Sequence, residues 1–218
     1  MSQIDQVHFA GNPDPVCPCV LLLDTSTSMH GASITALNEG LRTFYQDVQS
    51  DDLAHRRVEV AVITFGNGGV QMLQNFTKIA RAEIPTLTAG GNTPMGTAIG
   101  QALDIVKERK SILGKGGIPY YRPWMVLITD GAPTDDWQAA AERVRQEESA
   151  GGLSFFAIGV GEADMETLAK IAVRQPLKLH GLSFKEFFLW LSASQKRVSA
   201  SQPGEQVPLP PPKGWAMV

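Results

Sequence analysis

Cysteine is scarce in this chain: only Cys17 and Cys19 occur among its 218 residues. Their C-P-C spacing is too tight for the usual C-x-x-C zinc or redox pair, and no second pair exists to complete a zinc site. Alternation along a strand is expected to point the two side chains to opposite faces. The sequence therefore predicts buried or half-buried free thiols, which fits a reducing compartment.

Long apolar runs and any strong excess of charge are also missing. No stretch approaches the length needed to span a bilayer, and residues 1–15 have neither a basic start nor an apolar core, which predicts that there is no signal peptide. The net charge of -3 gives no general attraction to nucleic acid or to an anionic membrane. We therefore expect a cytoplasmic protein with neither as a partner. The one compact basic cluster consists of Lys107, Arg109, Lys110 and Lys115. We interpret it as the solvated end of a helix.

The motifs of common enzyme classes are absent as well. The chain has no G-x-S-x-G nucleophile elbow and no G-K-[ST] phosphate loop. A phosphohydrolase with Asp24 as its nucleophile would need a second Asp two positions later as general acid, where this chain has Ser26. The interpretation is a protein that is not an enzyme and has no catalytic residue, with a Mg²⁺-dependent phosphohydrolase as the alternative.

Strand-like and helix-like segments alternate along the chain. Strands are predicted where residues are continuously apolar or alternate, and helices where apolar residues recur at helical spacing. The predicted strands are 16–23, 57–65, 70–73, 124–129, 153–160 and 177–179, and the predicted helices are 34–48, 94–106, 137–148, 164–171 and 184–191. This order predicts a doubly wound α/β fold: a mostly parallel sheet with helices on both faces and one short antiparallel edge strand.

The ends of the chain differ from its middle in composition. We predict a domain of residues 16–195 between an N-terminal extension of residues 1–15 and a proline-rich tail of residues 196–218. Residues 208–212 fit a polyproline ligand for an aromatic groove, although a stiff spacer or a surface strap is favoured. Trp215 is too apolar to remain in water, so we expect it to dock on the domain.

Three polar segments carry the most information about function. Asp24, Ser26 and Ser28 lie in LLLDTSTSM, Thr93 in GGNTPMG and Asp130 in VLITDGAPTDD. Each is expected just past a strand-like run, at the edge where ligands bind in parallel sheets. Two carboxylates and three hydroxyls suit a hard cation such as Mg²⁺, which prefers oxygen ligands. The pattern therefore predicts a divalent cation, Mg²⁺ first, with Mn²⁺ or Ca²⁺ as alternatives.

These motifs resemble the metal-ion-dependent adhesion site of von Willebrand factor A domains, whose D-x-S-x-S motif matches residues 24–28. The resemblance implies the doubly wound fold with direct ion contacts from Ser26, Ser28 and Thr93. Asp24 and Asp130 would act through water or switch between direct and bridged contact. An open coordination position would take an Asp or Glu side chain of a partner protein. Thr27 stands where the family often has glycine, which is expected to stiffen the loop.

A narrower resemblance is to bacterial cytoplasmic von Willebrand A proteins of the tellurium-resistance TerY type. It rests on segments such as CPCVLLLDTSTSM, YYRPWMVLITDGAPTDDWQAAA and PKGWAMV. The resemblance implies kinase-like or phosphatase-like partners and a role in a stress-response or signalling assembly.

Less specific interpretations of the same residues stay open. Asp24, Ser26 and Ser28 could cap the helix that starts near residue 32, and Thr93 could cap the next helix. Asp130-Gly131 could be an ordinary turn. Asp135 and Asp136 are favoured as an acidic cap for the helix near residue 137. A structural subunit whose ion only ties loops together is a further alternative.

Overall fold

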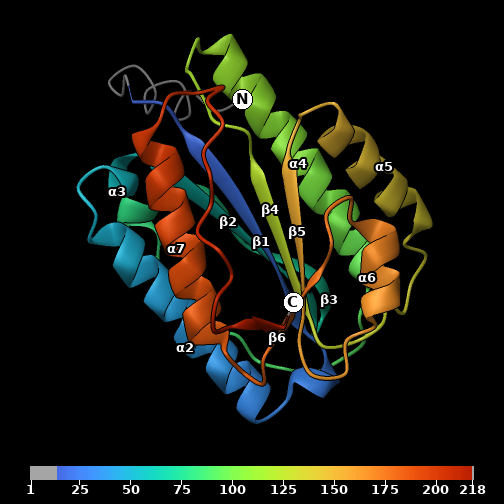
Figure 1. The fold of residues 1–218 in the computed structure, drawn as a ribbon. Helices are drawn as coiled ribbons and strands as arrows, with labels where there is room; N and C mark the ends of the chain where they lie inside the picture. The colour runs from blue at the N-terminus through green and yellow to red at the C-terminus, as the bar shows by residue number, and fades with distance from the viewer. Residues whose placement is uncertain (1–13, 218) are drawn as a thin grey trace.

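A seven-stranded sheet forms the centre of the computed structural model, which describes residues 14–217; all but the last two residues of the predicted N-terminal extension lie outside it (Figure 1). The strands are β1 (Cys17–Thr25), β2 (Val58–Gly66), β3 (Gly69–Lys78), β4 (Trp124–Thr129), β5 (Ser154–Gly159), β6 (Leu177–Leu179) and β7 (Ala216–Met217). The helices are η1 (Thr27–Met29), α2 (Ala32–Gln49), α3 (Ala54–Arg57), η2 (Ile79–Arg81), α4 (Met95–Lys115), α5 (Gln138–Ser149), α6 (Met165–Ile171) and α7 (Phe184–Ala200).

The strand order β3-β2-β1-β4-β5-β6-β7 confirms the predicted fold class. β1, β2, β4, β5 and β6 run parallel, and β3 pairs antiparallel with β2. Two details of the strands differ from the prediction. β3 has ten residues instead of four, and the chain end adds β7 antiparallel to β6. Within residues 14–217, no helix has the length and apolar character needed to cross a membrane.

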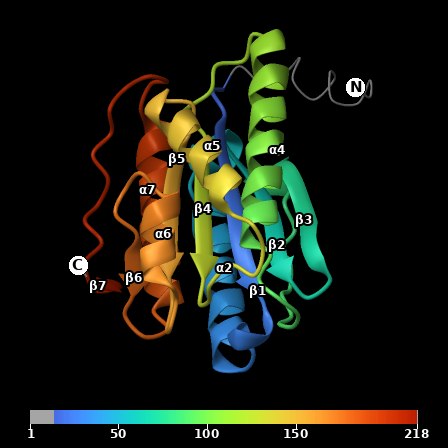
Figure 2. The same cartoon turned by 90° about the vertical axis from the view of Figure 1, so that its right-hand side faces the viewer.

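Helices cover both faces of the sheet. α2 and α7 pack on one face and α4, α5 and α6 on the other (Figures 1 and 2). The central strands β1, β2, β4 and β5 are buried along their whole length, which is why they read as nearly continuous apolar runs. This double covering leaves the two ends of the strands as the places where polar loops meet.

The two cysteines correct one expectation. Both thiols are free and buried, as predicted. However, Cys17 and Cys19 lie on the same face of β1, against α2 and α7, because residues two apart in a strand share a face. The prediction of opposite faces was wrong. Burial raises the pKa of both thiols, that of Cys19 to about 12.

The basic cluster of α4 is also less solvated than expected. Arg109 reaches across to β2, where its Nε and Nη2 donate to the two carboxylate oxygens of Glu59 at 2.8 and 2.7 Å. Glu59 is 2% exposed, so this fork satisfies a buried charge. The solvated-helix interpretation was therefore wrong for Arg109, whose partner lies fifty residues away in the sequence.

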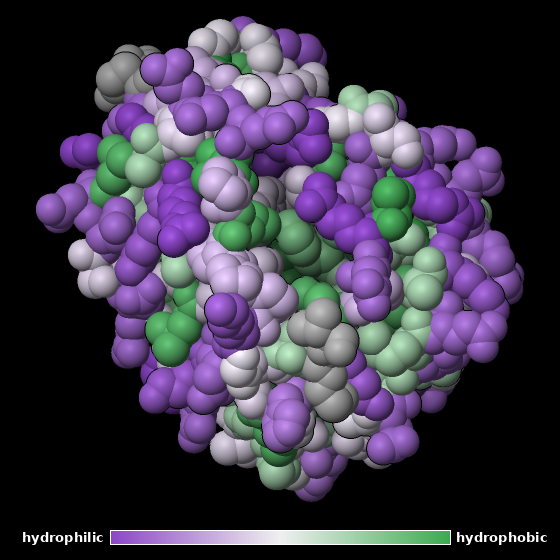
Figure 3. Space-filling model, in the orientation of Figure 1, coloured by the Kyte–Doolittle hydropathy of each residue, from purple (hydrophilic) through white to green (hydrophobic). Residues whose placement is uncertain are grey.

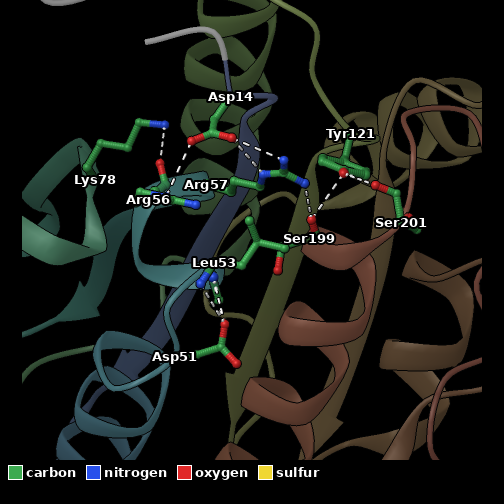
Figure 4. A network of polar contacts seen from close by, with 10 residues as sticks. Asp14, Asp51, Leu53, Arg56, Arg57, Lys78, Tyr121, Ser199 and Ser201 are labelled. Carbon is green, nitrogen blue, oxygen red and sulfur yellow. Dashed lines mark hydrogen bonds and ion pairs between the residues drawn. The ribbon is translucent and has the colours of Figure 1, made fainter.

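The last helix is longer than the sequence pattern indicated. α7 continues from the predicted end at Leu191 to Ala200, so the predicted domain boundary at residue 195 falls inside a helix. Its end is held by Arg57, which donates to the Ser199 carbonyl at 2.6 Å and to Asp14, and by Tyr121 (Figure 4). The expected docking of Trp215 is confirmed, because this side chain is 2% exposed.

Close packing of α2 on α7 generates a stability prediction. A Cβ on Gly40 of α2 would lie 2.6 Å from Phe188 Cδ2 and 3.1 Å from the backbone of Phe184. We expect Gly40→Ala to lower the free energy of unfolding by about 1–3 kcal/mol, because overpacking outweighs the gain in helix propensity.

Gly114→Ala in α4 is the matched control, since nothing lies within 4 Å of its Cβ position. It should raise the free energy of unfolding by up to about 1 kcal/mol. Urea unfolding of both variants checks the pair. Equal effects of the two substitutions would contradict the proposed close contact.

Candidate metal centre

The carboxylate of Asp24 lies at the carboxyl end of β1, where the strand order reverses. β1 stands between β2 and β4, so its end is the switch point at which open α/β sheets bind ligands. Asp24 is fully buried. Its Oδ1 accepts the Ser26 backbone N–H at 2.8 Å, and its Oδ2 accepts the Thr129 hydroxyl at 2.5 Å. Sequence reasoning missed Thr129, whose role depends on the pairing of β1 with β4.

The electrostatics of this carboxylate favour a cation. Burial raises the pKa of Asp24, hydrogen bonds from Ser26 and Thr129 oppose the shift, and the charge of Asp130 adds to it. The groups that lower the pKa are thus neutral donors. A positive charge beside the two carboxylates would offset both the burial and their mutual repulsion.

The hydroxyls of Ser26 and Ser28 connect the first loop to Asp130. Ser28 Oγ donates to Asp130 Oδ1 at 2.6 Å, and the Oγ atoms of Ser26 and Ser28 lie 3.0 Å apart. Ser26 is buried, Asp130 is half-buried and Ser28 is exposed. The row of oxygens therefore runs from the buried end of β1 to the surface.

Thr93 reaches the same place from a third segment. A Cβ added to Gly131 would lie 3.7 Å from Thr93 Oγ1 and 3.9 Å from Ser28 Oγ. Thr134 fixes this arrangement: its Oγ1 accepts the Thr93 N–H at 3.0 Å, and its own N–H donates to the Thr93 carbonyl at 2.9 Å. One expectation was wrong, because Thr93 follows a loop instead of a strand end.

Thr27 ties the first loop to the glycine-rich segment. Its N–H and its hydroxyl both donate to the Gly91 carbonyl, at 3.1 and 3.0 Å. Gly91 has a φ of 74°, and a Cβ there would lie 2.5 Å from the Gly66 carbonyl oxygen. Only glycine fits this position without strain. The hydroxyl bond, which a glycine at position 27 could not make, gives a physical basis for the stiffening expected from Thr27.

The helix-cap alternative for these residues does not hold. The N-cap of α2 is Gly31 and that of α4 is Pro94, and neither helix start receives a cap bond from its own N-cap side chain. The side chains of Asp24 and Ser28 are engaged with Thr129 and Asp130 instead.

Asp135 corrects a second expectation. Its carboxylate accepts the N–H groups of Gly96 and Thr97 at 2.9 and 2.8 Å, so it caps α4 from a distant loop and does not cap α5. The N-terminus of a helix favours a negative charge, which explains the placement. Asp136 is exposed. The Asp135 bonds thereby hold the Thr93 and Asp130 segments together.

The donor set fits a hard divalent cation. Asp24, Ser26, Ser28, Thr93 and Asp130 offer oxygen atoms alone, and Mg²⁺ usually takes one or two carboxylates together with neutral oxygens and water. Among residues 14–217, no group of three or more His, Cys, Asp or Glu side chains is placed to hold a metal.

Comparison with known proteins agrees with this architecture. The family model of the von Willebrand factor type A domain matches residues 19–186. The chain belongs to this family. Matrilin-3 of Gallus gallus is 29% identical over 170 residues, which cover 74% of this chain and 35% of matrilin-3. The chain thus spans about a third of this curated relative.

Solved structures of low sequence identity share the fold. The pilus adhesin SpaC from Lactobacillus rhamnosus GG has a TM-score of 0.67 at 17% identity, over 86% of this chain and 30% of SpaC. The manganese-loaded TRAP protein of Plasmodium vivax has a TM-score of 0.53 at 18% identity, over 76% of this chain and 65% of TRAP.

The Thr129–Asp24 hydrogen bond yields a prediction about stability. Thr129→Val keeps the shape of the side chain but removes the donor to a buried carboxylate, which should lower the free energy of unfolding by roughly 1–3 kcal/mol. Thr129→Ser keeps the hydroxyl and should lose less. Urea unfolding at neutral pH in chelator measures both. A valine variant at least as stable as the serine variant would refute the role given to this bond.

Proposed function

We propose that this chain is a metal-dependent protein-binding module. Ser26, Ser28 and Thr93 hold a divalent cation directly, while Asp24 and Asp130 balance its charge and orient hydroxyls and bound water. Mg²⁺ is the favoured ion, with Mn²⁺ or Ca²⁺ as alternatives. Once bound, the cation supplies an electrophilic centre that accepts an Asp or Glu side chain from a partner protein.

The observation that carries this proposal is the convergence of five oxygen-bearing side chains from three segments at the switch point between β1 and β4. Because Ser28 is exposed, a side chain of a partner protein can reach the site. Two relatives add support: one structural relative is named a pilus adhesin, and another was solved loaded with manganese.

A binding role is favoured over an enzymatic one for a chemical reason. An aspartyl phosphohydrolase needs a second carboxyl group near its nucleophile as a proton source. Asp130 is the second carboxylate at this edge, but it accepts the Ser28 hydroxyl, and Ser26 occupies the position expected for the acid.

The setting of this module is part of the proposal. The segments that resemble TerY-type proteins support a cytoplasmic stress-response or signalling assembly with kinase-like or phosphatase-like partners. Two buried free thiols fit a reducing compartment.

Metal binding should be visible as a change in stability. A cation that binds only the folded chain raises the free energy of unfolding by about 2.7 kcal/mol at roughly 100 times its dissociation constant. We expect Mg²⁺ and Mn²⁺ to raise the melting temperature of the wild type, and Ser28→Ala to abolish the shift. Ser111→Ala, an exposed serine in α4, is the matched control. An undiminished shift in Ser28→Ala would remove Ser28 from the ion site.

Partner binding separates this proposal from its alternatives. Proteins from a cell lysate are captured on the immobilised chain in Mg²⁺ and in chelator, with Ser28→Ala and Asp24→Ala as site variants and Ser111→Ala as control. We expect at least one protein to be retained by the wild type and the control in Mg²⁺ alone.

Stabilisation by metal without metal-dependent retention would favour a purely structural ion. Turnover of a generic phosphoester that is lost in Asp24→Ala would favour the phosphohydrolase. Either result would count against adhesion through the ion.

A further inference from the structure

The C-terminal tail, residues 201–217, follows a path of its own beside the domain. It leaves the end of α7, where the Ser201 carbonyl accepts the Tyr121 hydroxyl at 2.5 Å (Figure 4). It then runs back alongside α7 to the edge of the sheet (Figures 1 and 2). Residues 202–215 form neither helix nor strand, and most of them are exposed. Contacts with α7 and with β6 therefore hold the tail on the domain, without secondary structure of its own before β7.

Side chains of α7 bind the proline-rich part of the tail through its carbonyl groups. Trp190 Nε1 donates to the Pro210 carbonyl at 2.6 Å, and Arg197 Nη1 donates to the Pro208 carbonyl at 3.4 Å. Proline-rich segments lack internal hydrogen bonds, so their carbonyls are free for such donors. An aromatic surface that also presents a donor is the usual way in which proteins recognise these segments.

Trp215 anchors the far end of the tail in an aromatic cluster. Its ring centroid lies 5.1 Å from that of Phe187 and 5.2 Å from that of Trp190. The backbone continues the contact: the His180 N–H donates to the Trp215 carbonyl at 2.7 Å, and β7 then pairs antiparallel with β6. The tail thus adds a strand to the edge of the sheet, which is a second known mode of peptide binding.

The anchor has features of a releasable contact. Trp215 Nε1 is buried, and no described residue accepts its proton. Such an unsatisfied donor reduces the net gain from burying the ring. Two residues of β7 give a very short strand pairing. On the face of Figure 1, the surface is hollowed near its centre, with an apolar floor and a mostly hydrophilic rim (Figure 3).

We propose that Phe187, Trp190, Arg197 and the β6 edge form a peptide-binding groove, and that the chain's own tail is its exchangeable occupant. The ligand class is a proline-rich segment followed after a few residues by a tryptophan that enters the aromatic cluster. The groove shares no residue with the ion site. Binding in the groove needs no cation. A partner with a segment of this class binds in the groove by displacing the tail.

The test uses the full chain and a labelled peptide of residues 203–218. The full-length Trp215→Ala variant carries a weakened tail, so we expect it to bind the wild-type peptide at least about tenfold more tightly than the wild-type chain does. A Trp215→Ala peptide should lose this binding, whereas a Lys213→Ala peptide should keep it, because Lys213 is exposed. Adding Trp190→Phe to the variant chain should weaken binding, since it removes the donor to Pro210. Chelator should change none of these affinities.

Circular dichroism establishes that the variant chain is folded. Equal binding of the peptide by the folded variant and the wild type, or none by either, would overturn the proposal. If the variant does not fold, a protease site inserted after Gly204, an exposed position, replaces it. The cut chain should then exchange its tail for the labelled peptide, as followed by mass spectrometry after gel filtration. A cut tail that stays bound without exchange would show a fixed structural strap.

Discussion

The burial of one carboxylate at a strand end organises the candidate site. Asp24 is held inside the sheet edge by neutral donors from β4 and from its own loop. A charge in that position must be compensated. The Ser26 amide and the Thr129 hydroxyl do so in part by donating hydrogen bonds, whereas the nearby charge of Asp130 opposes them. The arrangement of the three loops follows from this requirement. Their mutual hydrogen bonds hold the oxygens in place.

Local patterns in the sequence predicted most of the fold. Buried strands such as β4 were recognisable because both of their faces are covered, which makes the run apolar throughout. The five candidate ligands were recognisable because short polar motifs followed or preceded such elements. Errors arose where a residue had two possible roles. They also arose where an element shows no regular spacing of apolar residues, as for the extension of α7 and for β7.

Contacts between distant segments could not be read in the same way. Asp135 lies just before α5 in the sequence, yet it caps α4 because the two loops meet only in the folded chain. Arg109 belongs to a basic run, but the buried Glu59 on β2 fixes its place. In both cases the partner that decides the role lies about forty or more residues away, where no local propensity carries information.

The shared face of Cys17 and Cys19 gives the protein an internal reporter of its own folding. Both thiols lie beneath α2 and α7, and their raised pKa values keep them protonated and unreactive while the sheet is closed. A thiol reagent can therefore modify them only during openings that uncover this face. Labelling kinetics would count such openings directly, without any engineered probe, and would report whether a bound ion or partner makes them rarer.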